Sequence, residues 1–266
     1  MIEARAVGVQ LGRPPSSAPS GALTTQRRTV DNITSAFQRG QVVAIVGRNA
    51  AGKTTLLRAL AGVIDVAAGE VLWDGKPLQR WSARERARRV AYVAQRPLLS
   101  ARFSVRETIE LGRYALAPSD QRIRAAIEAF GLTEIQDRIY HELSVGQQQR
   151  VALARAWAQV DANGAILLDE PFAAMDLAET DRSATLVRRF VSGGGLAIVV
   201  LHDLSLAARI ADAVVVLDAG RMALAGPIRE VLTTDFLTRH FGVPFRLDID
   251  GIPEPMVGQD GTKQVS

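Results

Sequence analysis

VVAIVGRNAAGKT, residues 42–54, joins an unbroken run of five apolar residues to a glycine-rich turn. A short apolar run bounded by glycines is typical of a strand buried inside a parallel sheet. Behind the turn, Leu56, Leu57 and Leu60 have the spacing of one face of a helix. The segment therefore predicts a buried strand, a tight turn and a helix in direct succession.

Residues 47–54 fit the pattern G-x-x-x-x-G-K-[ST], which cradles a polyphosphate where a strand passes into a helix. Glycines let backbone N–H groups turn inward, and the amino terminus of the helix adds positive potential. We expect Lys53 to reach the β and γ phosphates and the Thr54 hydroxyl to bind Mg²⁺. A glycine-rich turn with an incidental lysine is the alternative, and the flanking strand and helix argue against it. The pattern predicts a bound nucleoside triphosphate without specifying a reaction.

A second apolar run, residues 165–168, ends in Asp169 and Glu170. Adjacent side chains of a strand point in different directions, so the two carboxylates can have different tasks. We expect Asp169 to hold Mg²⁺ through water and Glu170 to polarise the attacking water. Two acids at a strand end are often a solvated turn, but the phosphate loop earlier in the chain favours the catalytic interpretation.

Further apolar runs at 196–201 and 213–217 also end in polar or acidic residues. Strands that alternate with helices predict an α/β fold with a mainly parallel sheet and ligands at the carboxyl ends of its strands. From about 104 to 160 no such run occurs, and the pattern there indicates a helical insertion. The proline- and serine-rich residues 13–21 predict a loop, and the polar tail from about 257 predicts a frayed end.

The composition is that of a folded protein, with 47% hydrophobic and 23% charged residues among 266. No apolar stretch approaches the roughly 20 residues of a membrane-spanning helix, and the first residues lack a secretory signal pattern. Without cysteine no disulfide or thiolate metal site can form, which favours a reducing cytoplasm. The net charge is +4, and we interpret the arginine-rich residues 84–89 as a solvated helix face rather than a nucleic-acid site, since no aromatics interleave with them.

Leu143-Ser144-Val145-Gly146-Gln147 begins another helical stretch shortly before the acidic pair. Ser144 followed three positions later by Gln147 is a capping box, which is the purely structural interpretation. The same cap aims a hydroxyl and free N–H groups outward, and such a helix start can bind an anion. Lying between the phosphate loop and the acidic strand end, the motif resembles the signature motif of ATP-binding cassette (ABC) ATPases. The resemblance extends from about Ile2 to Asp248.

The resemblance implies the ABC ATPase core of the P-loop NTPase class, with a mainly parallel sheet, an N-terminal antiparallel β subdomain and a helical insertion subdomain at about 96–160. It places one nucleotide-binding domain at 1–256, before the frayed tail at 257–266. ATP and Mg²⁺ are the implied cofactors. The implied nucleotide-binding residues are Gly47, Arg48, Asn49, Ala50, Ala51, Gly52, Lys53, Thr54, Thr55, Gln95, Ser144, Gly146, Gln147 and Asp176. The implied metal ligands are Thr54, Gln95 and Asp169, and the implied catalytic residues are Lys53, Glu170 and His202.

Three of these positions are implied only by the resemblance. Gln95 is similar to the Q-loop glutamine, which senses the γ phosphate and Mg²⁺ and joins the catalytic core to the helical lobe. Residues 173–176 resemble the D-loop, whose Asp176 couples the two active sites of a dimer. His202 resembles the switch histidine that contacts the γ phosphate, although a histidine after an apolar strand is otherwise more often a packing residue.

Family membership implies a homodimer, in which ATP on the phosphate loop of one copy is covered by Ser144 and Gly146 of the other. A cassette without membrane spans resembles the separate ATP-binding subunit of a bacterial importer. Such a subunit lies peripherally on the cytoplasmic face of the membrane. The implied partners are transmembrane permease subunits and a substrate-binding protein, and no nucleic-acid partner is expected. Flanking similarities at 74–78, 89–95 and 201–209 resemble importers of ferric siderophores, haem or cobalamin.

The segment at 96–113 is expected to receive a coupling helix of the permease. Its apolar residues Leu98, Leu99 and Phe103 form the expected contact, and an ordinary hydrophobic turn explains them equally well. Two other classes of function remain open. One is an ABC ATPase that assembles or remodels other proteins, and the other is a regulatory module that binds ATP with little turnover.

The sequence departs from the family pattern at three places. Ala50 and Val145 stand where glycines are usual, so each adds a Cβ beside a phosphate. We expect slower turnover rather than inactivity, because the other motif residues are present. No aromatic residue precedes Phe37, so adenine stacking is absent or comes from a guanidinium such as that of Arg13. This predicts weak discrimination between ATP and GTP.

Overall fold

The structure is a computed structural model that describes residues 1–10, 29–97, 99 and 101–256. Its central strand is the expected one, β3 (Val42–Gly47), in which every residue is buried. β3 lies in a six-stranded sheet of order β10-β9-β3-β8-β7-β6. The other strands of this sheet are β6 (Val90–Val93), β7 (Ala165–Asp169), β8 (Leu196–Val200), β9 (Ala213–Asp218) and β10 (Arg221–Pro227).

The neighbours of β3 run parallel to it, and the pairs β7–β8 and β6–β7 are parallel as well. Only β10 pairs antiparallel, at one edge of this sheet. The prediction of a mainly parallel sheet is thus confirmed. Because parallel strands finish at the same edge, Gly47 and Asp169, which end β3 and β7, come to one side of the sheet together with the residues that follow β8.

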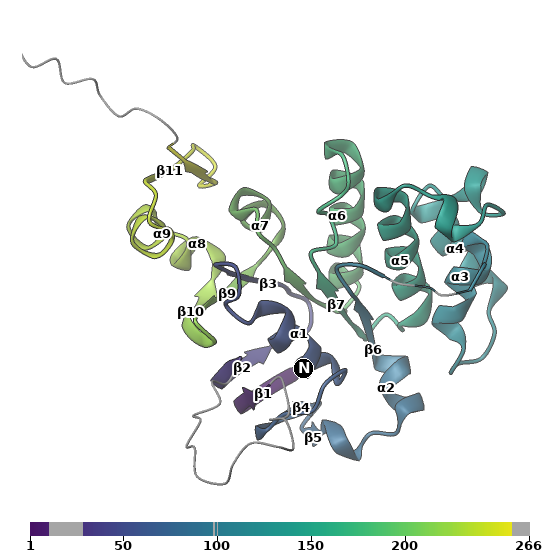
Figure 1. Cartoon of the computed structure of the whole chain (residues 1–266), viewed down its shortest axis with the longest axis horizontal. Coiled ribbons are helices and arrows are strands. Elements are labelled where there is room, and N and C mark those ends of the chain that lie inside the picture. The colour runs from purple at the N-terminus through teal and green to yellow at the C-terminus, as the bar shows by residue number, and fades with distance from the viewer. Residues whose placement is uncertain (11–28, 98, 100, 257–266) are drawn as a thin grey trace, which may run out of the picture.

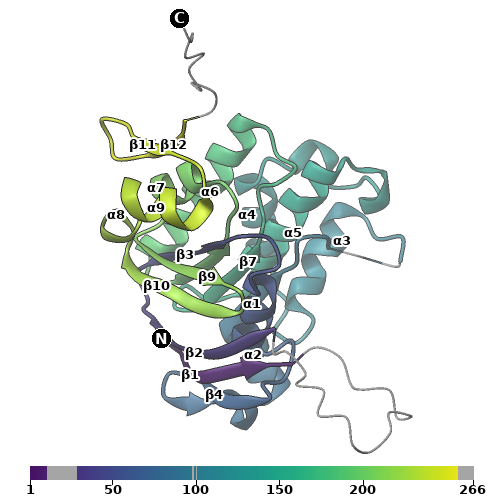
Figure 2. The same cartoon turned by 60° about the vertical axis from the view of Figure 1, so that its left-hand side comes forward.

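A second sheet has the order β2-β1-β4-β5, with antiparallel pairing throughout. Its strands are β1 (Ile2–Val9), β2 (Val30–Phe37), β4 (Ala68–Trp73) and β5 (Lys76–Pro77). Helix α1 (Lys53–Ala61) lies between the two sheets (Figures 1 and 2). Its leucines Leu56, Leu57 and Leu60 are fully buried in the core that both sheets share. The expected N-terminal antiparallel β subdomain is confirmed.

Helices α5 (Val145–Gln159), α6 (Leu177–Ser192) and α7 (Leu204–Ile210) cover the opposite face of the six-stranded sheet. Helices α3 (Val105–Glu110) and α4 (Asp120–Ala129) pack on α5 instead. Figure 1 shows α3, α4 and α5 grouped at one end of the molecule. The described part of 96–160 otherwise holds three single 3₁₀ turns, at Leu111–Arg113, Thr133–Ile135 and Tyr140–Glu142. The helical insertion is confirmed, whereas its bounds and those of the single domain stay predictions.

The remaining elements are peripheral. A 3₁₀ turn (Leu78–Arg80) leads to α2 (Ala83–Arg89), which buries none of its residues, as expected for a solvated arginine-rich helix face. The last described elements are α8 (Ile228–Val231), α9 (Thr234–Phe241) and the hairpin of β11 (Phe245–Leu247) and β12 (Pro253–Pro255). No helix in the described ranges is both long and apolar enough to span a membrane. The expected loop at 13–21 and the tail at 257–266 lie outside the described residues.

Candidate active site

The phosphate loop closes around the ammonium group of Lys53. Nζ of Lys53 donates hydrogen bonds to the carbonyl oxygens of Gly47, at 2.8 Å, and Arg48, at 3.1 Å. Burial lowers the pKa of Lys53, and the nearby charges of Glu170 and Asp169 oppose that change. The ammonium is therefore held inside the loop, with hydrogen bonds that phosphate oxygens can replace.

Glycine is required at the start of this loop, and alanine is strained in its middle. A Cβ on Gly47 would lie 2.1 Å from the Leu217 carbonyl oxygen, so a side chain cannot fit. Ala50 adopts a φ of 60°, in the left-handed region that glycine occupies without penalty. The departure from the family pattern at Ala50 thus falls on a position that does need a positive φ.

Two of the three predicted ligands of Mg²⁺, Thr54 and Asp169, lie together, whereas the side chain of Gln95 bonds Glu170. The Thr54 hydroxyl donates to Oδ1 of Asp169 at 3.0 Å, and Asp169 is 1% exposed. Burial raises the pKa of Asp169, while the hydrogen bond from Thr54 acts in the opposite direction. The Tyr92 hydroxyl contacts the second carboxylate oxygen of Asp169 at 3.4 Å. A hydroxyl and a carboxylate fit Mg²⁺, which usually takes only one or two protein carboxylates and completes its shell with phosphates and water.

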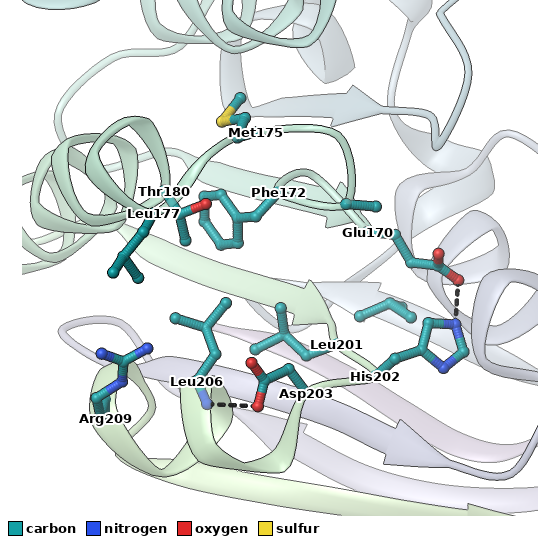
Figure 3. A pocket seen from close by; sticks show the side chains of 12 residues that line it. Glu170, Phe172, Met175, Leu177, Thr180, Leu201, His202, Asp203, Leu206 and Arg209 are labelled. Carbon is teal, nitrogen blue, oxygen red and sulfur yellow. Dashed lines mark hydrogen bonds and ion pairs between the residues drawn. The ribbon is translucent and has the colours of Figure 1, made fainter. Parts of the chain in front are cut away.

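Both carboxylate oxygens of Glu170 have partners. Nε2 of Gln95 donates to Oε2 at 2.7 Å, and Nε2 of His202 bonds Oε1, the contact drawn as a dashed line in Figure 3. Glu170 itself adopts a φ of 48° directly after β7. The ends of three strands thus bring together Gln95, Glu170 and His202, which are far apart in the sequence and which the resemblance implied as site residues.

These residues line one groove. Its volume is about 460 Å³, and its lining consists of Thr29, Asn49, Ala50, Ala51, Gly52, Lys53, Thr54, Thr55, Gln95, Glu170 and His202. A neighbouring hollow of about 470 Å³ shares Thr29 and residues 49–51, and adds Arg48 and residues 218–220. The sequence-based predictions assign no site role to Thr29, Tyr92 or residues 218–220. The alternation of side chains along β6 could have indicated that Tyr92 points to the same side of the sheet as the site, but no sequence signal indicates Thr29. The proposed adenine contact at Arg13 lies outside the described residues.

Ser144, Gly146, Gln147 and Asp176 do not line this groove. Ser144 and Gln147 form the expected capping box of α5, and Asp176 caps α6 by accepting a hydrogen bond from the Glu179 N–H at 2.8 Å. A Cβ on Gly146 would lie 2.5 Å from the Ala174 carbonyl oxygen. Within one copy, the signature motif therefore packs against the D-loop rather than facing the phosphate loop.

An apolar pocket adjoins Glu170 and His202 on the side of the D-loop. It has a volume of about 370 Å³, and Phe172, Met175, Leu201 and Leu206 are among the residues that line it (Figure 3). Leu177 stands at its rim with a side chain that is 75% exposed. The site is thus bordered by an uncovered apolar surface.

Across the described ranges, no group of three or more His, Cys, Asp or Glu side chains is placed to hold a metal ion. A single strand-end carboxylate beside a phosphate loop suits a metal that arrives with a nucleotide. Comparison with known families agrees, because the model of the ABC transporter family matches residues 30–173, which hold both the phosphate loop and the acidic pair. The chain belongs to the ABC transporter family.

Relatives match this ABC ATPase along nearly its whole length. The hemin import ATP-binding protein HmuV of Nocardia farcinica is 41% identical over 97% of this chain and 87% of its own. The protein of the same name from Rhodococcus jostii is 39% identical over 92% of this chain and 87% of its own. A solved ATP-binding subunit of an ABC transporter covers 91% of this chain and 93% of its own, with a TM-score of 0.74 at 23% identity, a likeness of fold. ATP hydrolysis coupled to transport, as expected from the sequence, is the activity of this ABC ATPase.

Proposed function

We propose that this ABC ATPase powers the import of haem. The similarity to hemin import ATP-binding proteins along nearly the whole chain carries this proposal. Ferric siderophores and cobalamin, which the sequence also indicated, are the competing cargoes. The proposed partners are two permease subunits and a substrate-binding protein, with the ATPase on the cytoplasmic face of the membrane. The ATPase does not touch the cargo in this arrangement, so its own groove needs to recognise only the nucleotide.

In the proposed site, Lys53 and the backbone N–H groups of residues 47–55 bind the phosphates of ATP. Thr54 and Asp169 hold Mg²⁺, which supplies positive charge to the β and γ phosphates when bound. Their existing hydrogen bond, at 3.0 Å, supports this assignment because it already brings both oxygens together. Gln95, which follows the carboxyl end of β6, is proposed as a further ligand of that Mg²⁺.

Glu170 is proposed to take a proton from the water that attacks the γ phosphate. Both oxygens of Glu170 are engaged by Gln95 and His202 in this structure, so fewer of their lone pairs are available to the attacking water. Arrival of the γ phosphate gives Gln95 and His202 a more strongly charged partner. Their release of Glu170 frees the base at the moment its substrate is in place.

The active unit is proposed to be a pair of copies. Ser144 and Gly146 lie outside the groove of their own chain, and Val145 between them is 61% exposed. The uncovered apolar pocket beside Glu170 and the exposed Leu177 also suit a second copy. A signature motif contributed by the partner completes a site that one copy leaves open, and ATP contacts that exist only in the closed pair drive closure.

Reconstitution tests the cargo. The ATPase is assembled in liposomes with the permease encoded beside it, and phosphate release is measured with the binding protein empty or loaded. Haem-loaded binding protein is expected to stimulate hydrolysis, whereas siderophore- or cobalamin-loaded protein is not. Stimulation by one of the latter instead would overturn the haem assignment. Failure to associate with any permease favours the assembly or remodelling alternative, and ATP binding without hydrolysis favours the regulatory module.

A further inference from the structure

Gln149, in the second turn of α5, joins two loops that carry functional residues. Its side chain is buried, with 4% of the residue exposed. Nε2 donates a hydrogen bond to the carbonyl oxygen of Gln95 at 3.4 Å, and Oε1 accepts one from the N–H of Ala174 at 3.2 Å. One carboxamide therefore ties the backbone of the Q-loop to the backbone of the D-loop.

A buried carboxamide needs both its donor and its acceptor satisfied, and Gln149 meets this need entirely with backbone groups of the two loops. Gly146, one turn earlier on α5, reinforces the contact with the D-loop. Its backbone approaches Ala174 so closely that an added Cβ would lie 2.5 Å from the carbonyl oxygen. Helix α5 thus bonds the N–H of Ala174 and packs closely against its carbonyl oxygen.

Both loops also reach Glu170. The side chain of Gln95 donates to the Glu170 carboxylate at 2.7 Å, and the N–H of Ala173 contacts the Glu170 carbonyl oxygen at 3.4 Å. Asp176, at the end of the D-loop, caps α6. Two chains of contacts therefore connect the Q-loop to the D-loop. One runs through Glu170, and the other runs through the side chain of Gln149.

We propose that Gln149 is a positioning residue that makes the Q-loop and the D-loop move together. When a nucleotide draws Gln95 toward its phosphates, the carbonyl of Gln95 pulls on the amide of Gln149, and this in turn displaces Ala174. The D-loop surface beside Asp176 then changes in step with the occupancy of the groove. The inference rests on the proposed nucleotide-binding function of the groove.

The neighbouring Gln148 supplies a matched control. It lies on the same helix, and its Nε2 donates to the carbonyl oxygens of Tyr140, at 3.2 Å, and Leu143, at 3.3 Å. Gln148→Met therefore removes two amide-to-backbone bonds without touching either loop. Gln149→Met keeps the length of the side chain and removes both loop contacts. A role that is only structural predicts the same behaviour for the two variants.

Hydrogen exchange in the full-length protein, at a concentration where it is a single copy, tests the coupling. A non-hydrolysable ATP analogue with Mg²⁺ is expected to slow exchange at residues 49–55 in every variant. In the wild type and Gln148→Met it also slows exchange at residues 173–176. In Gln149→Met the exchange of Ala174 without nucleotide is expected to rise about fivefold, the factor for one lost hydrogen bond, and the slowing of residues 173–176 by the analogue is lost.

Equal slowing of residues 173–176 in Gln149→Met and Gln148→Met overturns the proposal, and so does an increase in exchange that is uniform along α5. If Gln149→Met fails to fold, Gln149→Asn serves instead, since it keeps the carboxamide but is too short to reach both loops. Steady-state kinetics give a second readout, in which Gln149→Met lowers kcat about tenfold and leaves KM for ATP within twofold. A wild type that neither binds the analogue nor hydrolyses ATP contradicts the proposed function instead.

Discussion

Ala50 and Glu170 are non-glycine residues with positive φ values, 60° and 48°, and both line the nucleotide groove. A non-glycine residue in the left-handed region costs about 1 kcal/mol or more, and the surrounding structure must enforce it. At Glu170 the strain accompanies a proposed catalytic role, and the carboxylate bonds Gln95 and His202. At Ala50 no side-chain contact in the described structure explains it.

Ala50→Gly is therefore expected to stabilise the protein. Glycine relieves the left-handed strain, and we predict a gain of about 0.5–1 kcal/mol in the free energy of unfolding, measured by urea denaturation. Ala51→Gly is the matched control, since Ala51 is 3% exposed and has no positive φ, so its change should destabilise. A loss of stability in both variants would show that Ala50 is not strained.

Val145→Gly is expected to raise the rate of ATP hydrolysis several-fold. The Val145 side chain is 61% exposed beside the Ser144 cap, where the γ phosphate bound to the other copy is proposed to lie. Its removal costs helix stability, up to about 1 kcal/mol. Ala83→Gly, at the same position of α2, should lose helix stability with an unchanged rate in phosphate-release assays. No increase with Val145→Gly would mean that the valine does not slow turnover.

At the scale of elements, three helices begin with the same device. Capping boxes join Ser82 to Glu85, Ser104 to Glu107 and Ser144 to Gln147, at the starts of α2, α3 and α5. The box is a local structural feature in all three cases, as its sequence pattern indicates. Only the third box also belongs to the motif that is proposed to bind a nucleotide. Comparing it with the other two therefore distinguishes the capping role of the serine from its proposed role in nucleotide binding.

Ser144→Ala and Ser104→Ala are expected to lose similar stability, about 1 kcal/mol, because each removes the side-chain cap of one helix. ATP hydrolysis should fall at least tenfold in Ser144→Ala and stay within twofold of the wild type in Ser104→Ala. Thermal unfolding and phosphate release on the two purified variants make this comparison. Equal activities would leave Ser144 with a capping role alone.

The stabilisation by the capping box of α3 is expected to depend on pH, because its Glu107 can gain a proton. Backbone and side-chain hydrogen bonds from Ser104 lower the pKa of Glu107. The ionised form therefore stabilises the fold above the pKa of the unfolded chain, and this contribution is lost as the pH falls through the lower pKa of the folded protein. Glu107→Gln is expected to be less stable than the wild type at pH 7, and the difference should vanish toward acid pH in urea titrations. A difference that is constant with pH would contradict the role of the charge.

At the scale of the whole molecule, the site is open on one side. Lys53, Thr54 and Glu170 face the groove, whereas Ser144 lies elsewhere on the same copy. In the proposed pair, a second copy completes the site, and the stability of the pair is expected to depend on whether ATP remains intact between the two copies.

Glu170→Gln is expected to trap the pair. Loss of the base should slow hydrolysis by at least about 10²-fold and leave ATP binding intact. Light scattering should then give twice the mass with Mg-ATP and a single copy with Mg-ADP. A further change of Ser144 to Ala should weaken the pair, since it removes a contact made only across the interface. If the Glu170→Gln variant remains a single copy at saturating ATP, the proposal of a site shared by two copies is wrong.

Local patterns were enough to predict the strand, turn and helix of residues 42–61, the acidic end of β7 and the cap of α5. Each depends on neighbours in the chain, through side-chain periodicity, glycine conformation or a three-residue spacing. The family resemblance added Gln95 and His202, because their order among the motifs is informative where their local surroundings are not. The order of the sheet strands, in contrast, depends on hydrogen bonds between segments that are far apart in the sequence.

Strand order is what assembles the site. Placing β3 beside β8, and β8 beside β7, brings Lys53, Glu170 and His202 to one edge of the sheet. The bridge that Gln149 makes between the Q-loop and the D-loop has no local pattern at all, because its two partners are backbone groups of remote loops. Local chemistry thus specifies each motif, whereas the distances between motifs depend on strand pairing and packing between segments that are far apart in the sequence.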